Sequence, residues 1–222
     1  MEFNTWNYST KFKQVMQKFA IGIPTLNRYD LLKPSLMLYI RDFPTTHIFV
    51  LDNGHQGIIQ NGVFLKENDK NIGVGPSWNW LCDQIFQVAD NALILNDDIY
   101  LGKKEKDIDD LLHKKKNKGC LLKATPDWCA FILPKRIYEK VGKFDECFYP
   151  AYYEDNSYKY RMKLQGISVL NTPELNPLVY KNSSTLAKDP SILEDSKRNK
   201  QLYIEMWGGE PNQEKYKTPF NK

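Results

Sequence analysis

The segment from Leu93 to Tyr100 places an apolar run of strand length directly before Asn96-Asp97-Asp98. An apolar run of this kind is typical of a strand buried on both faces, as in parallel sheets covered by helices. Two carboxylates at its end would lie at the carboxyl edge of the sheet, where open α/β sheets bind ligands. Adjacent carboxylates repel each other, and water or a hard divalent cation can neutralise them. Such a pair is also common where a strand simply leaves into solvent, so its meaning depends on what else converges there.

Two earlier strand-like segments also end in polar loops. The apolar residues 19–23 lead into Pro24-Thr25-Leu26-Asn27-Arg28, and residues 47–51 lead into Asp52-Asn53-Gly54. Asp and Asn before Gly are also ordinary turn residues, so Asp52 has a purely local interpretation. Because the carboxyl ends of parallel strands meet at one edge, three polar strand ends in succession favour a shared site over three unrelated loops.

The order of the elements predicts an α/β fold. Strands alternate with helices through the first hundred residues, which predicts a parallel sheet with right-handed crossovers. Further strands are expected at 63–65, 120–123, 128–133 and 167–170, and helices at 31–40, 78–88, 107–116, 158–164 and 191–206.

Composition excludes several classes of function. The net charge of +4 over 222 residues is too mild to indicate nucleic-acid binding. No run approaches the length of a transmembrane segment, and the N-terminus lacks the apolar centre of a signal peptide. The four cysteines show no C-x-x-C spacing. Reduced thiols in a cytoplasmic protein are therefore expected.

Several of these segments, in this order and at similar spacing, resemble the family 2-type glycosyltransferases of the GT-A fold. The resemblance covers residues 19 to about 170, and its parts are Ile23 to Arg28, Asp52-Asn53-Gly54, Asn71-Ile72-Gly73 with Asn79, Asn96-Asp97-Asp98, Val141 to Glu146, and Tyr153-Glu154-Asp155 followed by Tyr160-Arg161 and Gly166. It implies a Rossmann-like, mostly parallel central sheet flanked by helices, with a short antiparallel sheet on the acceptor side. One domain over 1–222 is expected, with a nucleotide-sugar half at about 19–100, an acceptor and catalytic half at about 101–186, and a C-terminal helix and tail at 187–222.

The resemblance also implies an inverting transfer from a nucleotide-sugar donor to a glycan or glycoconjugate acceptor, assisted by Mn²⁺ or Mg²⁺. Asp98 matches the metal-binding last acid of the family's D-x-D motif. Asp97 matches the middle position and Asn96 the first acid, and both are expected to touch ribose or donor sugar. Since Asn96 replaces an acid, the metal site has one charge fewer than in the family.

The remaining donor contacts are carried over in the same way. Asp52 matches the aspartate that accepts the uracil imide proton, which favours a UDP- or dTDP-sugar. Many relatives have a metal-binding histidine where this chain has Lys181, so either the metal has fewer protein ligands or Lys181 acts directly on the diphosphate. The other expected donor-binding residues are Pro24, Thr25, Asn27, Arg28, Asn53, Asn71, Gly73 and Asn79.

Asp155 matches the family's general base, and Glu154 is the first alternative. A carboxylate within hydrogen-bond reach of the acceptor hydroxyl suffices for this role. Acids also favour helix N-termini, so the pair has a capping interpretation. Trp128, Tyr152 and Tyr153 are candidates for an aromatic acceptor platform, with core packing as the alternative for each.

Two other functions remain open at this stage. The departures at Asn96 and Lys181 are compatible with a catalytically silent module that binds a nucleotide sugar or glycan. A sugar-nucleotide nucleotidyltransferase ranks lower, because the loop after the first strand has no glycine. The sequence also leaves open whether the chain is a domain of, or a partner to, a larger glycan-assembly enzyme.

Overall fold

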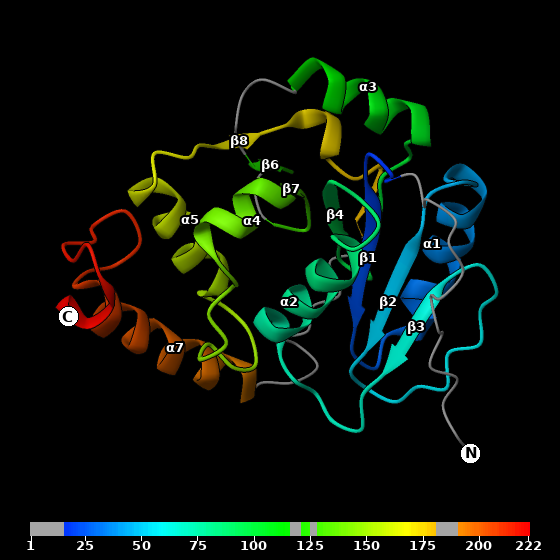
Figure 1. Cartoon of the computed structure of the whole chain (residues 1–222). Coiled ribbons are helices and arrows are strands. Elements are labelled where there is room, and N and C mark those ends of the chain that lie inside the picture. The colour runs from blue at the N-terminus through cyan, green and yellow to red at the C-terminus, as the bar shows by residue number, and fades with distance from the viewer. Residues whose placement is uncertain (1–15, 116–120, 125–127, 181–190) are drawn as a thin grey trace.

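The computed structural model describes residues 16–115, 121–124, 128–180 and 191–222 (Figure 1). Its strands are β1 Ala20–Thr25, β2 Ile48–Asp52, β3 Phe64–Glu67, β4 Asn91–Leu95, β5 Ile99–Tyr100, β6 Leu121–Lys123, β7 Ala130–Pro134, β8 Val169–Asn171 and β9 Val179–Tyr180. Its helices are α1 Tyr29–Asp42, α2 Val74–Ile85, α3 Glu105–Lys115, α4 Lys135–Val141, α5 Glu154–Leu164 and α7 Ser191–Trp207, with short 3-10 turns at Pro173–Leu175 and Pro219–Asn221.

Seven strands form one mixed sheet in the order β3-β2-β1-β4-β7-β6-β8. The first four are parallel, β7 is antiparallel to both of its neighbours, and β8 pairs in parallel with β6. The strands β5 and β9 form a separate antiparallel pair. The predictions of a mostly parallel α/β sheet and of a short antiparallel sheet are therefore confirmed.

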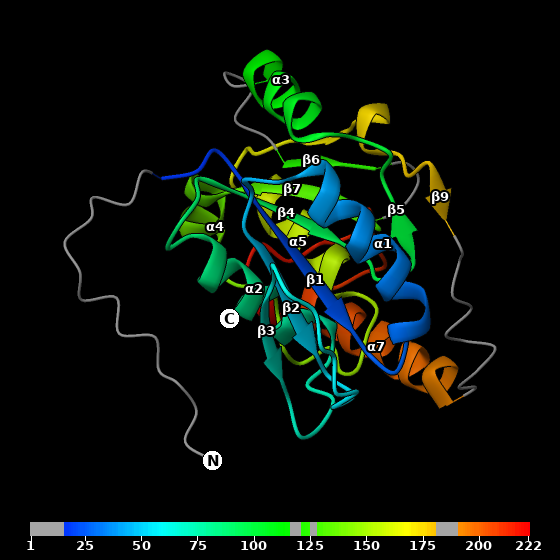
Figure 2. The same ribbon diagram turned by 90° about the vertical axis from the view of Figure 1, so that its right-hand side faces the viewer.

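Helices cover both faces of the large sheet (Figures 1 and 2). One buried cluster joins α1 and α3 to one face, and a second joins α2, α4 and α5 to the other. Successive residues of β4 alternate between the two clusters, so that Leu93 and Leu95 belong to the first and Ala92 and Ile94 to the second. Burial on both faces explains why this strand reads as a continuous apolar run.

A third cluster attaches α7 to the second face. Tyr203 and Trp207 of α7 pack with Phe148 and with Tyr160 of α5. The rings of Tyr160 and Trp207 meet edge to face with centroids 5.0 Å apart. Helix α7 therefore supports α5, the helix that begins with Glu154-Asp155.

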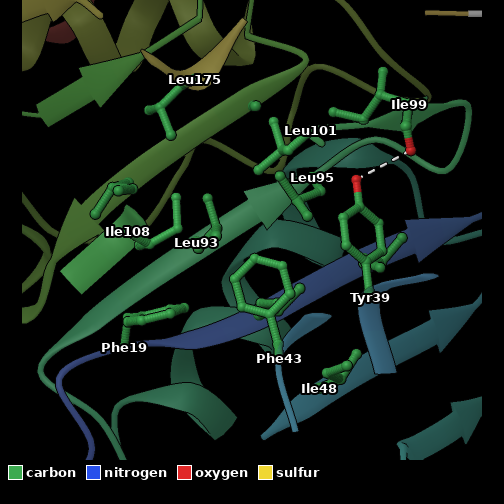
Figure 3. Packing of buried hydrophobic residues seen from close by; sticks show 14 of the residues in the cluster. Phe19, Tyr39, Phe43, Ile48, Leu93, Leu95, Ile99, Leu101, Ile108 and Leu175 are labelled. Carbon is green, nitrogen blue, oxygen red and sulfur yellow. Dashed lines mark hydrogen bonds between the residues drawn. The ribbon is translucent and has the colours of Figure 1, made fainter. Parts of the chain in front are cut away.

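The packing under α1 fixes the chain just after the acid pair (Figure 3). The buried hydroxyl of Tyr39 donates a hydrogen bond of 3.1 Å to the carbonyl oxygen of Ile99. Ile99 is fully buried in the first cluster, and it directly follows Asp98. The turn that carries the carboxylates is thus anchored from the core.

Among the predicted boundaries that were wrong, three affect the site. Helix α2 begins at Val74 rather than at 78, because Gly73, at φ 87°, ends the preceding loop and Pro76 needs no N–H partner in a first turn. Helix α5 begins at Glu154 rather than at 158, so the acid pair lies inside its first turn. Strand β7 begins at Ala130, which leaves Trp128 in the loop before it.

The described residues include three of the four cysteines. Cys82, Cys129 and Cys147 are free thiols, while Cys120 lies outside the described residues. No helix in the part of the chain that the structure describes is long and apolar enough to cross a membrane.

Truncation of Leu93 tests the importance of the two-faced burial of β4. Leu93→Ala should lower the free energy of unfolding by about 2–5 kcal/mol, because it removes a fully buried side chain and leaves a cavity. Leu193→Ala is the matched control, since Leu193 is 51% exposed on α7 and its truncation should cost less than about 0.5 kcal/mol. Urea unfolding measures both, and equal losses would contradict this placement of β4.

Candidate active site

Polar side chains at the ends of β1, β2 and β4 are joined to one another. Thr25 and Asp52 are register partners at the ends of β1 and β2, and the N–H of Asn53 donates to the carbonyl oxygen of Thr25 at 2.9 Å. The hydroxyl of Thr25 donates to Oδ2 of Asp97 at 2.8 Å. The expected convergence of the three strand ends at one edge is therefore present in the fold.

The acid pair after β4 is largely withdrawn from solvent. Asp98 is 5% exposed. The pKa of Asp97 is raised to about 6, mainly by burial and also by the charge of Asp98. The hydrogen bond from Thr25 lowers it in part. The Arg28 guanidinium also lowers the pKa of Asp97. A cation beside the pair would relieve this repulsion.

The acid pair fits a hard divalent cation that takes its other ligands from elsewhere. No group of three or more His, Cys, Asp or Glu side chains converges anywhere in the described ranges. Mg²⁺ in phosphate-transferring sites is commonly held by one or two carboxylates together with substrate phosphates and water. The carboxylates of Asp97 and Asp98 can supply such a partial ligand set.

Asp52 is fully buried, and its carboxylate holds the loop that follows it. Its Oδ1 accepts from the N–H of Gly54 at 2.8 Å and from Nε2 of Gln56 at 2.7 Å. Its Oδ2 accepts from the N–H of Gln56 at 2.6 Å. A carboxylate offers about four acceptor positions, so one is left for a ligand. The local interpretation of Asp52 holds, and its contact with a base stays a prediction.

The other residues of this edge have equally specific positions. Asn53 is 5% exposed, its amide donates to the Ser77 hydroxyl at 2.8 Å, and its oxygen accepts from Asn68 at 2.8 Å. Asn27 has a φ of 53° and lies close to Gly54, where an added Cβ would be 2.3 Å from the Oδ1 of Asn27.

Two further predicted residues are positioned by backbone pairing. Pro24 pairs with Leu51 inside the ladder between β1 and β2. The N–H of Asn96 donates to the Cys129 carbonyl oxygen at 2.8 Å.

The loop before α2 contacts the second half of the chain. Asn71 Oδ1 accepts from the N–H of Gly73 at 2.8 Å, and the N–H of Val74 donates to the carbonyl oxygen of Pro150 at 2.8 Å. A Cβ at Gly73 would lie 3.0 Å from that same oxygen. The glycine therefore permits a close approach of two backbones as well as a positive φ.

Asn79 is 2% exposed and lies in α2 behind this loop. Its Nδ2 donates to the Phe144 carbonyl oxygen and to Glu146, each at 2.9 Å, and its Oδ1 accepts from the N–H of Phe144 at 2.8 Å. The side chain thus fixes the turn at 144–146. The predicted place of Asn79 at the border of the donor stays a prediction.

Glu154 and Asp155 lie in the first turn of α5, and their environments differ. Glu154 is 5% exposed, and its Oε2 has no hydrogen-bond partner among the described residues. Burial raises the pKa of Glu154 to about 8, with the charge of Asp155 adding to the shift. Glu154 is therefore mostly protonated at neutral pH, which leaves Asp155 as the better base.

Burial also raises the pKa of Asp155. Hydrogen bonds from backbone N–H groups and the charges of Lys123 and Lys159 lower it, but their effect is smaller than that of burial. Its Oδ1 accepts from the N–H of Asn156 at 2.8 Å and from Nδ2 of the same residue at 3.1 Å. A carboxylate with a raised pKa binds a proton more strongly, which suits a general base.

The strand ends connect Asp155 to the acid pair. Leu95 at the end of β4 pairs with Ala130, and Lys123 at the end of β6 pairs with Phe131. Both ends therefore lie at the same edge, on either side of the start of β7, with strand spacings of about 4.8 Å. Asp98 lies three residues after the end of β4. Lys123, at the end of β6, is near enough to Asp155 for its charge to act on that carboxylate.

The aromatic acceptor candidates differ in exposure. Trp128 is 8% exposed and packs edge to face on Phe131 with centroids 5.1 Å apart, which is the core-packing alternative. Tyr153 packs on Tyr203 at 5.6 Å, whereas Tyr152 is 37% exposed. Acceptor contacts from all three stay predictions, and Tyr152 is the best placed for one.

Two residues at this site were not predicted. Lys123 is 8% exposed and lies near enough to Asp155 for its charge to act on that carboxylate. The sequence signal that could have identified it is a lysine at the end of a short apolar strand. Asn199 of α7 is fully buried, and its Nδ2 donates to the carbonyl oxygens of Tyr149, Ala151 and Tyr152 at 3.2, 2.8 and 3.4 Å. Asn199 therefore fixes the loop before α5. The loop is far from Asn199 in the sequence, so no local sequence pattern predicts this contact. Lys181 lies outside the described residues.

Comparison with known proteins identifies the fold. No family model and no curated protein matches the sequence. The structure resembles the mannosyltransferase PcManGT from Pyrobaculum calidifontis in complex with GDP-Man and Mn²⁺, with a TM-score of 0.61, 11% identity, and coverage of 77% of this chain and 59% of that one. It also resembles GalNAc-T7 with UDP, GalNAc and Mn²⁺, with a TM-score of 0.66, 10% identity, and coverage of 88% and 49%.

A third similar structure is the catalytic domain of Drosophila beta1,4-galactosyltransferase 7 in complex with xylobiose, with a TM-score of 0.52, 14% identity, and coverage of 78% and 74%. The chain spans about three fifths and about half of the first two proteins. The fold is that of the GT-A glycosyltransferases. At such low identities the likeness shows the fold alone, and it assigns the chain to no particular family within that class.

The buried Glu154 gives a prediction about stability. In the unfolded chain its pKa is near 4.5, and in the folded protein it is about 8, so between these values the folded state holds the extra proton and stability falls as pH rises. Glu154→Gln removes this penalty. It should therefore stabilise the protein more at pH 8 than at pH 5, by at least about 1.4 kcal/mol, the equivalent of one pKa unit.

Urea unfolding of the wild type and the variant at both pH values measures this difference. Glu67→Gln is the control, because Glu67 is exposed at the end of β3. A Glu154→Gln effect that does not depend on pH would show that Glu154 is ionised in the folded protein.

Proposed function

We propose that this chain is an inverting glycosyltransferase that moves a sugar from a nucleoside diphosphate to a hydroxyl of a saccharide. The observation that carries the proposal is the occurrence of a buried acid pair at the end of β4 and a further carboxylate, Asp155, whose pKa is raised by burial, at the same sheet edge. The GT-A fold supports the substrate class, since one similar structure is a complex with GDP-Man and another holds UDP and GalNAc.

In the proposed reaction Asp155 accepts the proton of the acceptor hydroxyl. The freed oxygen attacks the anomeric carbon from the face opposite the leaving group, and the bond from that carbon to the diphosphate oxygen breaks as the new one forms. The electron pair of the broken bond leaves with the nucleoside diphosphate. Inversion follows because a single in-line displacement takes place.

On the donor side, Asp98 with Asp97 beside it would hold Mn²⁺ or Mg²⁺. A bound ion of this kind supplies positive charge to a leaving diphosphate. Thr25 fixes the Asp97 carboxylate through its 2.8 Å hydrogen bond, and the Arg28 charge lies near enough to act on the same group.

A UDP- or dTDP-sugar is the proposed donor. The carboxylate of Asp52 has about one acceptor position left after its three loop contacts, and uracil and thymine each present one imide N–H. Guanine, the base of GDP, also carries an N–H, but on a larger ring system with a different arrangement of groups. The preference therefore depends on the single remaining acceptor of Asp52.

A silent binding module is the second candidate, and it is favoured by Asn96, which reduces the charge available to a metal. Asp155→Asn separates the two functions. It should lower kcat for sugar transfer by about 10²–10⁴-fold, the usual contribution of a general base, and leave UDP affinity near that of the wild type. Isothermal titration with UDP and a coupled UDP-release assay measure the two quantities.

The pH profile provides an independent check on the same residue. The acid limb of kcat/KM for the wild type should lie above pH 3.8, the ordinary pKa of an aspartate, because burial raises the pKa of Asp155. The exposed Asp69→Asn is the control and should retain this limb. Loss of UDP binding together with turnover in Asp155→Asn would indicate a structural role.

Asp98→Asn tests the metal assignment. The substitution keeps the size of the side chain and removes its charge, so the affinity for Mn²⁺ in the presence of UDP should fall by more than about tenfold, as for other losses of metal-site groups. Electron paramagnetic resonance of free Mn²⁺ gives the binding constant. Unchanged Mn²⁺ affinity in Asp98→Asn, with Asp69→Asn as control, would place the metal elsewhere.

A further inference from the structure

A hollow of about 410 Å³ lies beside the helix that carries the proposed base. Its walls are the outer face of α5, the segment 166–169 that leads into β8, and residues 211–214 of the tail after α7. In Figure 1 this tail, in red, lies next to α5. The hydroxyl of Tyr160 donates to the Tyr216 carbonyl oxygen at 2.8 Å and so fixes the tail against the helix. The volume is in the range of sites that hold small ligands.

The lining of the hollow begins one residue after Asp155 along α5. Asn156 lines it and donates two hydrogen bonds to the Asp155 carboxylate, at 2.8 and 3.1 Å. Lys159, one turn further along α5, lines it as well, and its charge acts on Asp155. A ligand in the hollow would therefore extend along α5 away from the proposed base.

The charges that line the hollow favour an anion. Lys159 and Lys163 are exposed, and neither forms an ion pair with another described residue. Lys163 Nζ lies 5.8 Å from the centroid of the Tyr160 ring, its charge acts on Glu214, and the charge of Lys159 acts on Asp155, so two lysines face a single acid within the lining. Glu214 is the one acid in the lining, and its Oε1 already accepts from the Tyr203 hydroxyl at 2.7 Å and from the N–H of Asn212 at 2.9 Å.

We propose that this hollow is a distal acceptor subsite that binds a sugar unit bearing a carboxylate or phosphate group. Lys159 and Lys163 would pair with the anionic group, and the amides of Asn156 and Asn212 would contact the hydroxyls. The acceptor would then be an oligosaccharide or glycoconjugate of at least two units, with the reacting hydroxyl at Asp155 and an acidic unit further along α5. The inference rests on the proposed transferase function and adds the chemical class of its acceptor.

Titrations of the full chain with glucuronate, glucose 6-phosphate, glucose and inorganic phosphate test this subsite without donor or metal. Backbone amide shifts of residues 156–169 and 212–214, followed by NMR, report binding. At least one acidic sugar should shift these amides saturably, about tenfold more tightly than glucose or inorganic phosphate, because each charge-assisted hydrogen bond adds affinity. The better of the two acidic sugars identifies the anionic group.

The double variant Lys159→Ala/Lys163→Ala should bind that acidic sugar at least about tenfold more weakly. Lys106→Ala/Lys114→Ala makes the same charge change on α3 and should bind it like the wild type. Inorganic phosphate or glucose binding as tightly as the acidic sugars would overturn the proposal, as would wild-type affinity in the Lys159→Ala/Lys163→Ala variant or no amide shift with any probe. Because donor and metal are absent, these failures are distinct from a failure of the Asp155→Asn experiment.

Discussion

The close contact between the start of α2 and the chain before α5 is the constraint on which the rest of the site depends. The N–H of Val74 donates to the carbonyl oxygen of Pro150 at 2.8 Å, and added Cβ atoms at Gly73 and Gly75 would lie 3.0 Å from that oxygen and 2.9 Å from the carbonyl oxygen of Asp145. Side chains at these two positions would force the backbones apart. The ends of β1, β2 and β4 and the carboxylates of α5 would then no longer share one edge.

The contact is held from both sides by buried polar groups. The side-chain amide of Asn79 forms hydrogen bonds with the backbone of Phe144, and that of Asn199 in α7 donates to the carbonyl oxygen of Ala151. Within α5, the Ser157 hydroxyl bridges Asp145 and the indole N–H of Trp207. Buried carboxylates are costly, and a fold retains them where the surrounding hydrogen bonds hold a fixed geometry. The proposed in-line displacement would require such a fixed geometry.

Much of the fold was predictable because its signals are local. The apolar run of β4 and the polar ends of β1 and β2 are visible in the sequence, and so is the convergence of those ends in a parallel sheet. The partners of Asn79 and Asn199 lie about 65 and 50 residues away, and no local pattern reports such contacts. The start of α5 was misplaced because Tyr152 and Tyr153 take positive φ values directly before it, which tyrosine rarely does. The roles of the site residues were carried over by resemblance and remain proposals.

The most direct measurement of the central claim is a crystal structure of the protein with Mn²⁺ and UDP, in which anomalous scattering locates the metal. We predict that the carboxylate of Asp98 would hold the Mn²⁺ ion and that the UDP diphosphate would lie beside it, in a cleft that Asp155 also borders. A nucleotide bound away from the ends of β1, β2 and β4, or a metal with no ligand among Asp97 and Asp98, would contradict this prediction.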